Sequence, residues 1–187
     1  LIWRADEMAA YPDRMTDMID HWAEKTPDTV WMAERDGDGW REVTYAQLAR
    51  DVRRIGQWLL DRDLSTDRPV MILSENTLEH AILALSAQYV GLPSAAISPA
   101  YALVATDYAK LRGIADQITP GAVFAQTAAP FEDAILKALP EDVIVITAEG
   151  RVSAVVLGIL PVGLGVVMFT LNPNYTSVLV TTTIGLV

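Results

Sequence analysis

The segment from Arg68 to Tyr101 constrains the fold most, because its periodicity changes twice within a short length. Val70 to Ser74 begins as a wholly apolar run, which suits a strand buried on both faces of a parallel sheet. From Thr77 the apolar residues recur at helical spacing until Gly91, and a short strand, Ser94 to Ile97, follows directly. The segment therefore predicts one strand, helix, strand unit with a right-handed crossover.

The flanking segments repeat this alternation. Upstream we predict a helix, a β-hairpin and a second helix with a capping box at its start, over Arg14 to Lys25, Thr29 to Arg35 with Trp40 to Val43, and Tyr45 to Asp61. Downstream we predict a helix over Asp107 to Ile118 and a buried strand over Ala122 to Ala125. A second helix, with Pro130 at its first position, and a second buried strand over Val143 to Thr147 follow. This order predicts the α/β class, with a doubly wound open sheet covered by helices on both faces.

Particular residues also resemble a known family. They are Leu73-Ser74-Glu75-Asn76 with Glu79-His80-Ala81, Ser98-Pro99-Ala100-Tyr101, Lys110-Leu111-Arg112, Ala33-Glu34-Arg35-Asp36, Gly39-Trp40-Arg41, Thr44-Tyr45 and Arg53-Arg54-Ile55. Together they resemble the N-terminal part of adenylate-forming acyl-CoA synthetases of the AMP-binding family, and most closely feruloyl-CoA synthases. The likeness extends over about residues 11 to 147, so we expect residues 1–150 to be a partial N-terminal domain of this family.

The resemblance implies an acid–CoA ligase that uses ATP, magnesium and coenzyme A, with an aromatic carboxylic acid such as ferulate as substrate. A loop that binds ATP phosphates needs backbone amides and an ammonium group to offset several negative charges. Lys25, Lys110 and Lys137 all lie in predicted helices, and none follows a glycine-rich loop. We therefore assign no catalytic, cofactor-binding or metal-binding residue, and we expect ATP, magnesium, coenzyme A and the acid to bind only the full-length parent, so the fragment alone is expected to be inactive.

A few isolated residues have a functional interpretation beside a structural one. The helical histidines His21 (beside Asp17 and Glu24) and His80 (beside Glu79) are more readily explained as structural or surface residues than as metal ligands or bases. The arginines Arg50, Arg53, Arg54 and Arg62 are interleaved with aspartates, which favours a salt-bridged surface over an anion site. The turn Asp36-Gly37-Asp38-Gly39 lacks the later ligands of a calcium loop. Tyr101 is placed in a loop at the carboxyl end of a strand, where a full-length enzyme could use it to line an acyl pocket.

Charge is distributed unevenly along the chain. The 187 residues contain 24 Asp and Glu against 14 Lys and Arg, and this acidic balance argues against a nucleic-acid partner. There is no cysteine, which excludes disulfides and fits a reducing, cytoplasmic setting for residues 1–150. The first residue is not Met and no signal peptide is visible, so we expect a chain cut from a longer protein. Every charged residue lies at or before Arg151, which indicates a second kind of segment, residues 151–187.

Val152 to Leu171 has no charged residue and is long enough, at about 1.5 Å per residue, to cross a hydrocarbon core of roughly 30 Å. We predict a transmembrane helix there, inserted in the bacterial inner membrane. The alternative is two buried strands, Val152 to Leu160 and Val166 to Leu171, that pair into the sheet of a noncatalytic domain. Gly158 to Gly165 has no basic residue nearby, so a packing or hinge role is favoured over a phosphate loop.

The tail resembles a different family. The residues concerned are Ser153-Ala154, Leu160-Pro161-Val162, Asn172-Pro173, Tyr175, Ser177, Leu179 and Gly185. They resemble the last membrane helix and C-terminal tail of Flp/Tad pilus assembly proteins of the type II secretion F family. Two hypotheses follow beside the truncated ligase: a membrane-anchored module of a pilus or secretion platform, and a chimeric reading frame with no function of its own.

Overall fold

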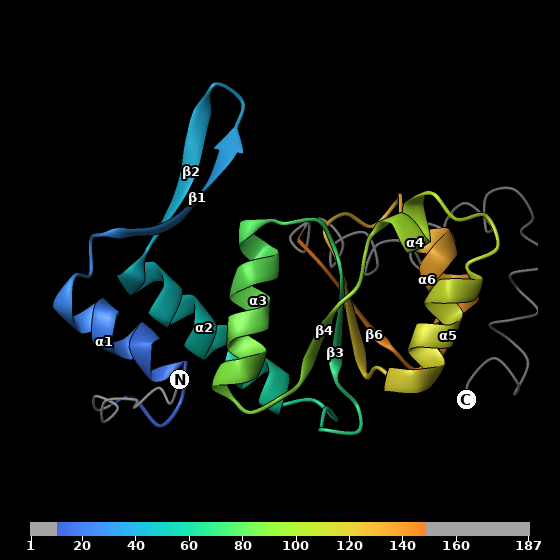
Figure 1. The fold of residues 1–187 in the computed structure, drawn as a ribbon, viewed down its shortest axis with the longest axis horizontal. Coiled ribbons are helices and arrows are strands. Elements are labelled where there is room, and N and C mark those ends of the chain that lie inside the picture. Colours follow the sequence, from blue (N-terminus) through green and yellow to red (C-terminus); the bar gives the residue numbers. More distant parts are fainter. Residues whose placement is uncertain (1–10, 149–187) are drawn as a thin grey trace, which may run out of the picture. The chain divides into compact units, whose positions relative to one another are not determined.

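The computed structural model describes residues 11–148. Six helices and six strands are found in this part of the chain. In chain order they are α1 (Asp17–Lys25), β1 (Val30–Asp36), β2 (Gly39–Thr44), α2 (Tyr45–Leu60), β3 (Val70–Leu73), α3 (Leu78–Tyr89), β4 (Ser94–Ala96), α4 (Ala100–Leu103), α5 (Ala109–Ile118), β5 (Ala122–Ala125), α6 (Glu132–Ala138) and β6 (Ile144–Thr147) (Figure 1).

A four-stranded parallel sheet with the order β4-β3-β5-β6 forms the centre of this region. The first strand of the sheet, β3, lies inside it, with β4 on one side and β5 and β6 on the other. All four residues of β3 are buried, which explains why its sequence is continuously apolar instead of alternating. The chain therefore winds outward from β3 in both directions, and the predicted doubly wound α/β sheet is confirmed for the described residues.

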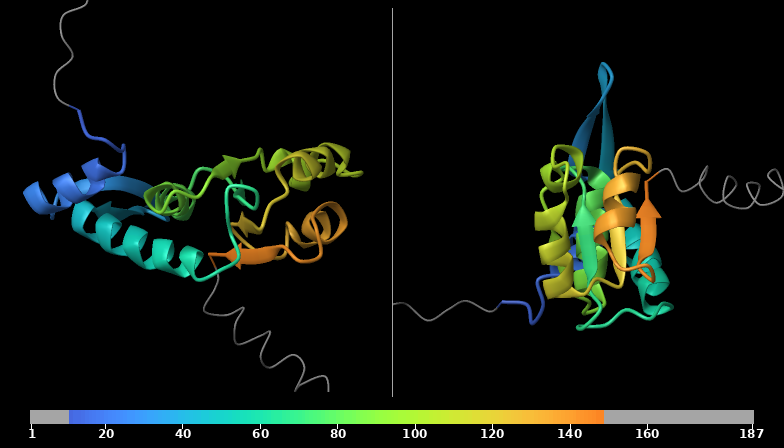
Figure 2. Two further views of the ribbon diagram at one scale, coloured as in Figure 1. Left: turned by 90° about the horizontal axis from the view of Figure 1, so that it is seen from below. Right: turned by 90° about the vertical axis from the view of Figure 1, so that its right-hand side faces the viewer.

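Helices cover both faces of the sheet, as Figures 1 and 2 show: α2 and α3 lie on one side, and α4, α5 and α6 on the other. Alternate residues of β3 serve the two layers. Val70 and Ile72 pack in a cluster with Leu59 of α2 and Leu83 of α3, whereas Met71 and its neighbours pack in a cluster with residues of α4, α5 and α6. A third cluster joins α1, α2 and α3.

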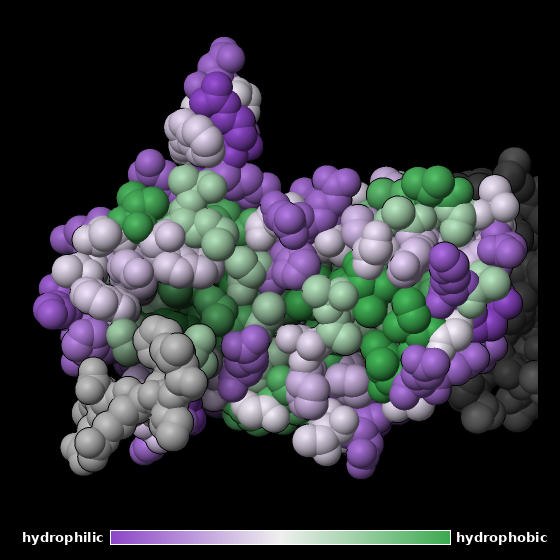
Figure 3. All heavy atoms as spheres, viewed as in Figure 1, coloured by the Kyte–Doolittle hydropathy of each residue, from purple (hydrophilic) through white to green (hydrophobic). Residues whose placement is uncertain are grey.

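The hairpin of β1 and β2 is a separate antiparallel sheet that stands out from the helices (Figure 1). Its tip is hydrophilic and apolar residues gather toward its base (Figure 3). Gly37, with φ of +57°, allows the tight turn between the strands. At the base, the Thr44 hydroxyl accepts from the Gln47 backbone N–H at 3.3 Å and the Gln47 side chain accepts from the Thr44 N–H at 2.8 Å, so the predicted capping box of α2 is confirmed.

Two predictions for the carboxyl half were wrong in detail. Tyr101 does not lie in a loop: it belongs to the short helix α4, which forms because the carbonyl groups of Ser98 and Pro99 accept helical hydrogen bonds and Ala102 is buried against the core. Strand β6 is not buried like β3. Its Val145 is 51% exposed, because among residues 11–148 β6 is an edge strand that pairs only with β5.

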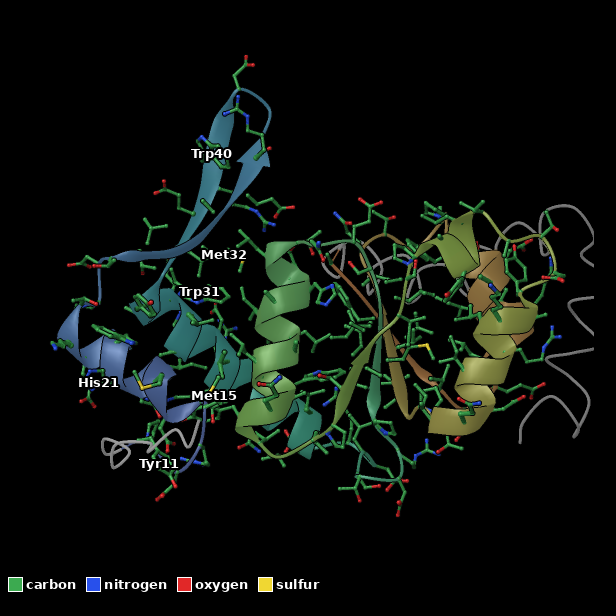
Figure 4. The ribbon with its side chains drawn as sticks, in the orientation of Figure 1. Tyr11, Met15, His21, Trp31, Met32 and Trp40 are labelled. Carbon is green, nitrogen blue, oxygen red and sulfur yellow. The ribbon has the colours of Figure 1, made fainter. Side chains whose placement is uncertain are left out.

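Two helix starts also differ. Helix α1 begins at Asp17 instead of Arg14, and Met15, which lies within the predicted helix, is 86% exposed (Figure 4). Pro130 lies two residues before the first residue of α6, with Phe131 as the N-cap, so it is not the first helical residue. The difference at α6 is of the size by which helix ends fray, and the difference at α1 is slightly larger.

The tail predictions lie outside the described residues. These are the domain of residues 151–187, the transmembrane helix of residues 152–171 and the resemblance to pilus assembly proteins. Within residues 11–148 no helix combines the length and apolar character that crossing a membrane requires.

Candidate functional site

The carboxyl ends of the parallel strands are where a doubly wound sheet binds ligands, at the point where the strand order reverses. Here that point lies between β3 and β5, because β4 was added on one side of β3 and β5 on the other. The loop after β3 runs from Ser74 to Thr77, and the loop after β5 begins at Gln126. The topology therefore marks the edge between these two loops as the place where a ligand would bind.

The polar side chains of the loop after β3 bond within the loop. The buried Ser74 donates its hydroxyl hydrogen to the carbonyl oxygen of Glu75 at 3.1 Å. The Thr77 hydroxyl caps α3 by accepting from the backbone N–H of His80 at 3.2 Å. The His80 Nδ1 atom lies 3.0 Å from the Glu75 carbonyl oxygen. These groups thus fix the shape of the loop and the start of α3.

An ion-pair network ties the hairpin to the same end of α3. Arg41 of β2 donates to Glu34 of β1 at 2.6 Å and to both carboxylate oxygens of Glu79 of α3, one of them at 2.9 Å. Glu34 also accepts from the backbone N–H of Leu78 at 3.4 Å. The hydrogen bonds from Arg41 hold the pKa of Glu79 below its ordinary value, and those bonds raise the pKa of Arg41. The network positions the hairpin against the loop after β3.

One groove, the α2–α3 groove, lies where α2 and α3 meet the sheet. Its cavity volume is about 590 Å³, within the range of small-molecule sites. The walls are mainly apolar, with Ile55 and Trp58 from α2, Leu83 from α3, Phe124 from β5 and Ile146 from β6. Charged side chains at the lining come from Arg41, Asp51, Arg54 and Glu79.

A second groove, the hairpin groove, lies between β1 and α3 and has a volume of about 670 Å³. Trp31 and Met32 form its hairpin side at the base of the β-ribbon (Figure 4), and Ala81 and Leu85 form part of its helix side. Met32 is 38% exposed, so this groove too presents apolar surface to solvent.

Comparison with protein-family models gives a match to the AMP-binding enzyme family over residues 19–154. This match covers well over half of the sequence. The chain belongs to the AMP-binding enzyme family. A comparison with curated proteins found no match.

Solved structures of adenylate-forming proteins share the AMP-binding fold seen here. A fatty acyl-adenylate ligase from L. pneumophila, in complex with acyl adenylate and pyrophosphate, superposes with a TM-score of 0.58 at 20% identity, over 72% of this chain and 23% of that one. VinN superposes with a TM-score of 0.61 at 17% identity, over 77% of this chain and 34% of the VinN chain. The nonribosomal peptide synthetase FmoA3 superposes with a TM-score of 0.56 at 22% identity, over 72% of this chain and 13% of the FmoA3 chain.

The described AMP-binding region thus corresponds to a minor part of each of these proteins, between 13% and 34% of their chains. At these identities the superpositions establish a shared fold.

The sequence-predicted residues do not converge on one site in this AMP-binding domain. His21 is exposed on α1, with its ring edge-on to Trp22 at 5.0 Å between centroids (Figure 4). Asp17, its neighbour on the helix, pairs with Arg14 at 2.7 Å. Residues 11–148 contain no group of three His, Cys, Asp or Glu side chains that could hold a metal ion. His80 lies at a different place, in the capped start of α3.

The arginines of α2 have more varied partners than the sequence indicated. Arg50 contacts the adjacent Asp51 at 3.4 Å, as interleaving predicts, but Arg53 reaches Asp20 on α1 at 2.7 Å. Arg62 lies over the Trp58 ring at 3.3 Å and donates to a backbone carbonyl. Arg54, which the sequence analysis grouped with the other three arginines, is exposed as predicted and lines the α2–α3 groove, a position that nothing local in the sequence indicates.

Proposed function

We propose that this chain is part of the N-terminal domain of an ATP-dependent acid–CoA ligase, with an aromatic carboxylic acid such as ferulate as the parent substrate, and that it supplies scaffold instead of chemistry. The family match over residues 19–154 supports the coarse assignment. The resemblance of Leu73 to Asn76 and of Ser98 to Tyr101 to feruloyl-CoA synthases supports the aromatic acid.

One observation supports the expectation that the chain alone does not catalyse the ligase reaction. The described glycines are Gly37, Gly39, Gly56, Gly91, Gly113 and Gly121, and none lies in a loop that follows the carboxyl end of a strand of the parallel sheet. Lys110 and Lys137 lie in α5 and α6. The described carboxyl edge thus lacks the combination of backbone amides and ammonium group that triphosphate binding needs. On this proposal ATP, magnesium and coenzyme A bind to segments of a parent enzyme that this chain does not contain.

The test is an assay of the purified chain with ATP, magnesium chloride, ferulate and coenzyme A. Pyrophosphate release and thioester absorbance report the two half-reactions separately. We expect both to equal the protein-free blank, while a complete adenylate-forming ligase assayed in parallel gives signal. ATP-dependent pyrophosphate release by this chain, lost again on heat denaturation, would overturn the proposal.

A second candidate is favoured by the absence of charge from residues 152–187. In this alternative the tail anchors the chain in the bacterial inner membrane as a module of a pilus or secretion platform, or it marks a chimeric reading frame. Fractionation of tagged chains tests the anchor: the full chain should pellet with membranes and a chain ending at residue 150 should not. Long sequencing reads across the codons for Thr147 to Val152 test the chimera, which predicts that no single read crosses the junction.

A further inference from the structure

A cluster of charged side chains attaches the hairpin of β1 and β2 to the start of α3. The Arg41 guanidinium of β2 donates to both carboxylate oxygens of Glu79 on α3 and to Glu34, its cross-strand neighbour on β1. Glu34 in turn accepts from the backbone N–H of Leu78 at 3.4 Å. Within residues 11–148 no other ion pair or side-chain hydrogen bond joins the hairpin to α3.

Apolar packing of the hairpin lies at its base. Trp31 and Val43 pack against the cluster that joins α1, α2 and α3. Farther out, the space between β1 and α3 is the hairpin groove of about 670 Å³, and Trp40 near the tip is 61% exposed (Figure 4). The register of the two strands shifts between Val30 and Met32, and such an irregularity bends a strand locally. The hairpin therefore has a bend at its base and open space on its α3 side.

Arg41 also cancels a repulsion between the hairpin and α3. Glu34 and Glu79 both lie within hydrogen-bond distance of the same guanidinium, so the two carboxylates are close to each other. Without the cation between them, like charges at this separation repel, and the repulsion acts between β1 and α3. The side chains of Arg41, Glu34 and Glu79 are 46%, 27% and 30% exposed, so dissolved salt weakens their interactions. Removal of one cation thus turns an attraction into a repulsion.

We propose that the hairpin is a hinged arm that Arg41 latches to α3, and that loss or screening of the Arg41 contacts lets the intact hairpin swing away from α3 about its base. The hydrogen bonds between β1 and β2 lie within the arm, so the swing leaves them in place. It separates Glu34 from the Leu78 N–H and widens the hairpin groove between Met32 and Leu85. The device responds to ionic conditions and is independent of the ligase assignment.

The experiment measures the distance between the hairpin tip and α3 in the full chain. The sequence contains no cysteine, so Asp38→Cys at the tip and Gln88→Cys near the end of α3, both at exposed positions, introduce two specific spin labels for pulsed EPR. We expect a docked and a released distance population, whose ratio falls about fivefold in Arg41→Gln, the upper range of a partly exposed ion pair. Raising the salt concentration from about 0.05 to about 0.5 M should lower this ratio in the labelled parent and raise it in Arg41→Gln, because salt there screens the repulsion.

Two further variants make the result decisive. Arg35→Gln makes the same charge change on β1, where the guanidinium lies over the Trp40 ring at 5.1 Å within the hairpin, and it should leave the ratio unaltered. Adding Glu79→Gln to Arg41→Gln removes one of the two repelling charges and should restore part of the docked population.

Amide exchange measured by NMR separates a swing from unfolding of the hairpin. Exchange of the Leu78 amide with water should accelerate in Arg41→Gln, while the amides paired between β1 and β2 keep their protection. An unchanged distance in Arg41→Gln, an equal effect of Arg35→Gln, no recovery on adding Glu79→Gln, or loss of protection between β1 and β2 would each overturn the proposal.

Discussion

Two glycines inside helices provide a matched test of the packing between α2 and α3. Gly56 lies in α2 and is buried, and a Cβ built there would stand 2.8 Å from Cγ1 of Val90 and 3.6 Å from the carbonyl oxygen of Ser86. Gly113 lies in α5, where a Cβ would meet nothing within 4 Å. Both positions have ordinary helical backbone, so replacement by alanine differs mainly in the space available.

The expected free-energy changes have opposite sign. Alanine is favoured over glycine in a helix interior by about 0.5–1 kcal/mol, so Gly113→Ala should raise the free energy of unfolding by this amount. In Gly56→Ala the same gain is opposed by a carbon–carbon contact shorter than the favourable 3.5 Å, and overpacking of this kind costs about 1–3 kcal/mol. Val90 is β-branched and its χ1 is restricted, so its methyl group cannot rotate away freely. We expect Gly56→Ala to be destabilising by about 1 kcal/mol net.

Urea denaturation followed by far-UV circular dichroism measures both variants, and thermal midpoints should separate by several degrees, at about 2–4 °C per kcal/mol. The double variant Gly56→Ala, Val90→Ala removes the clashing methyl group and should show a favourable coupling of about 1 kcal/mol relative to the sum of the single changes. If Gly56→Ala stabilises the protein as much as Gly113→Ala, or if the double variant is additive, the inferred close approach of α2 and α3 is wrong.

Further predictions concern the start of α3. Arg41→Gln should lower the free energy of unfolding at pH 7 by about 0.5–1 kcal/mol, because the partners are partly exposed. The pKa of Glu79 is depressed in the folded state, so its contribution is present above the ordinary carboxyl pKa and disappears as the pH falls through the folded value. Urea midpoints of wild type and Arg41→Gln should therefore converge on acidification; a constant difference would contradict this. Thr77→Ala removes the N-cap of α3 and should cost about 1 kcal/mol in the same assay, whereas Thr77→Ser, which keeps the hydroxyl, should cost less than half of that.

The helices and strands could be predicted from the sequence because their signals are local. The capping box of Thr44 and Gln47, the glycine after α3 and the apolar run of β3 each specify their structure within a few residues. The errors arose where a neighbour decides the outcome. Val145 belongs to a strand that is mostly apolar like β3, and its exposure follows from β6 being the last strand of the sheet within the described residues. Tyr101 lies in a helix partly because Ala102 packs against the distant core.

The grooves could not be predicted for the same reason. The walls of the α2–α3 groove come from residues as far apart as Ile55 and Ile146, which the parallel sheet and the two helices bring together. Arg54 looks like its neighbours in the sequence, and it becomes distinct only when the partners of Arg50 and Arg53 are known. Local periodicity therefore determines the elements, whereas the choice of ion-pair partners among the described arginines is a property of the assembled layers.

The edge strand β6 connects the fold to the question of activity. A doubly wound sheet covers both faces by adding strands and helices outward from its centre, and β6 is the last strand described here. On the α2 side, Phe124 of β5 is buried, but Ile146 of β6 is only partly covered and lines the groove. Apolar surface at such an edge is costly to expose. Ile146 therefore contributes partly covered apolar surface to the α2–α3 groove, and any molecule that bound there in the folded state alone would raise the unfolding free energy by mass action.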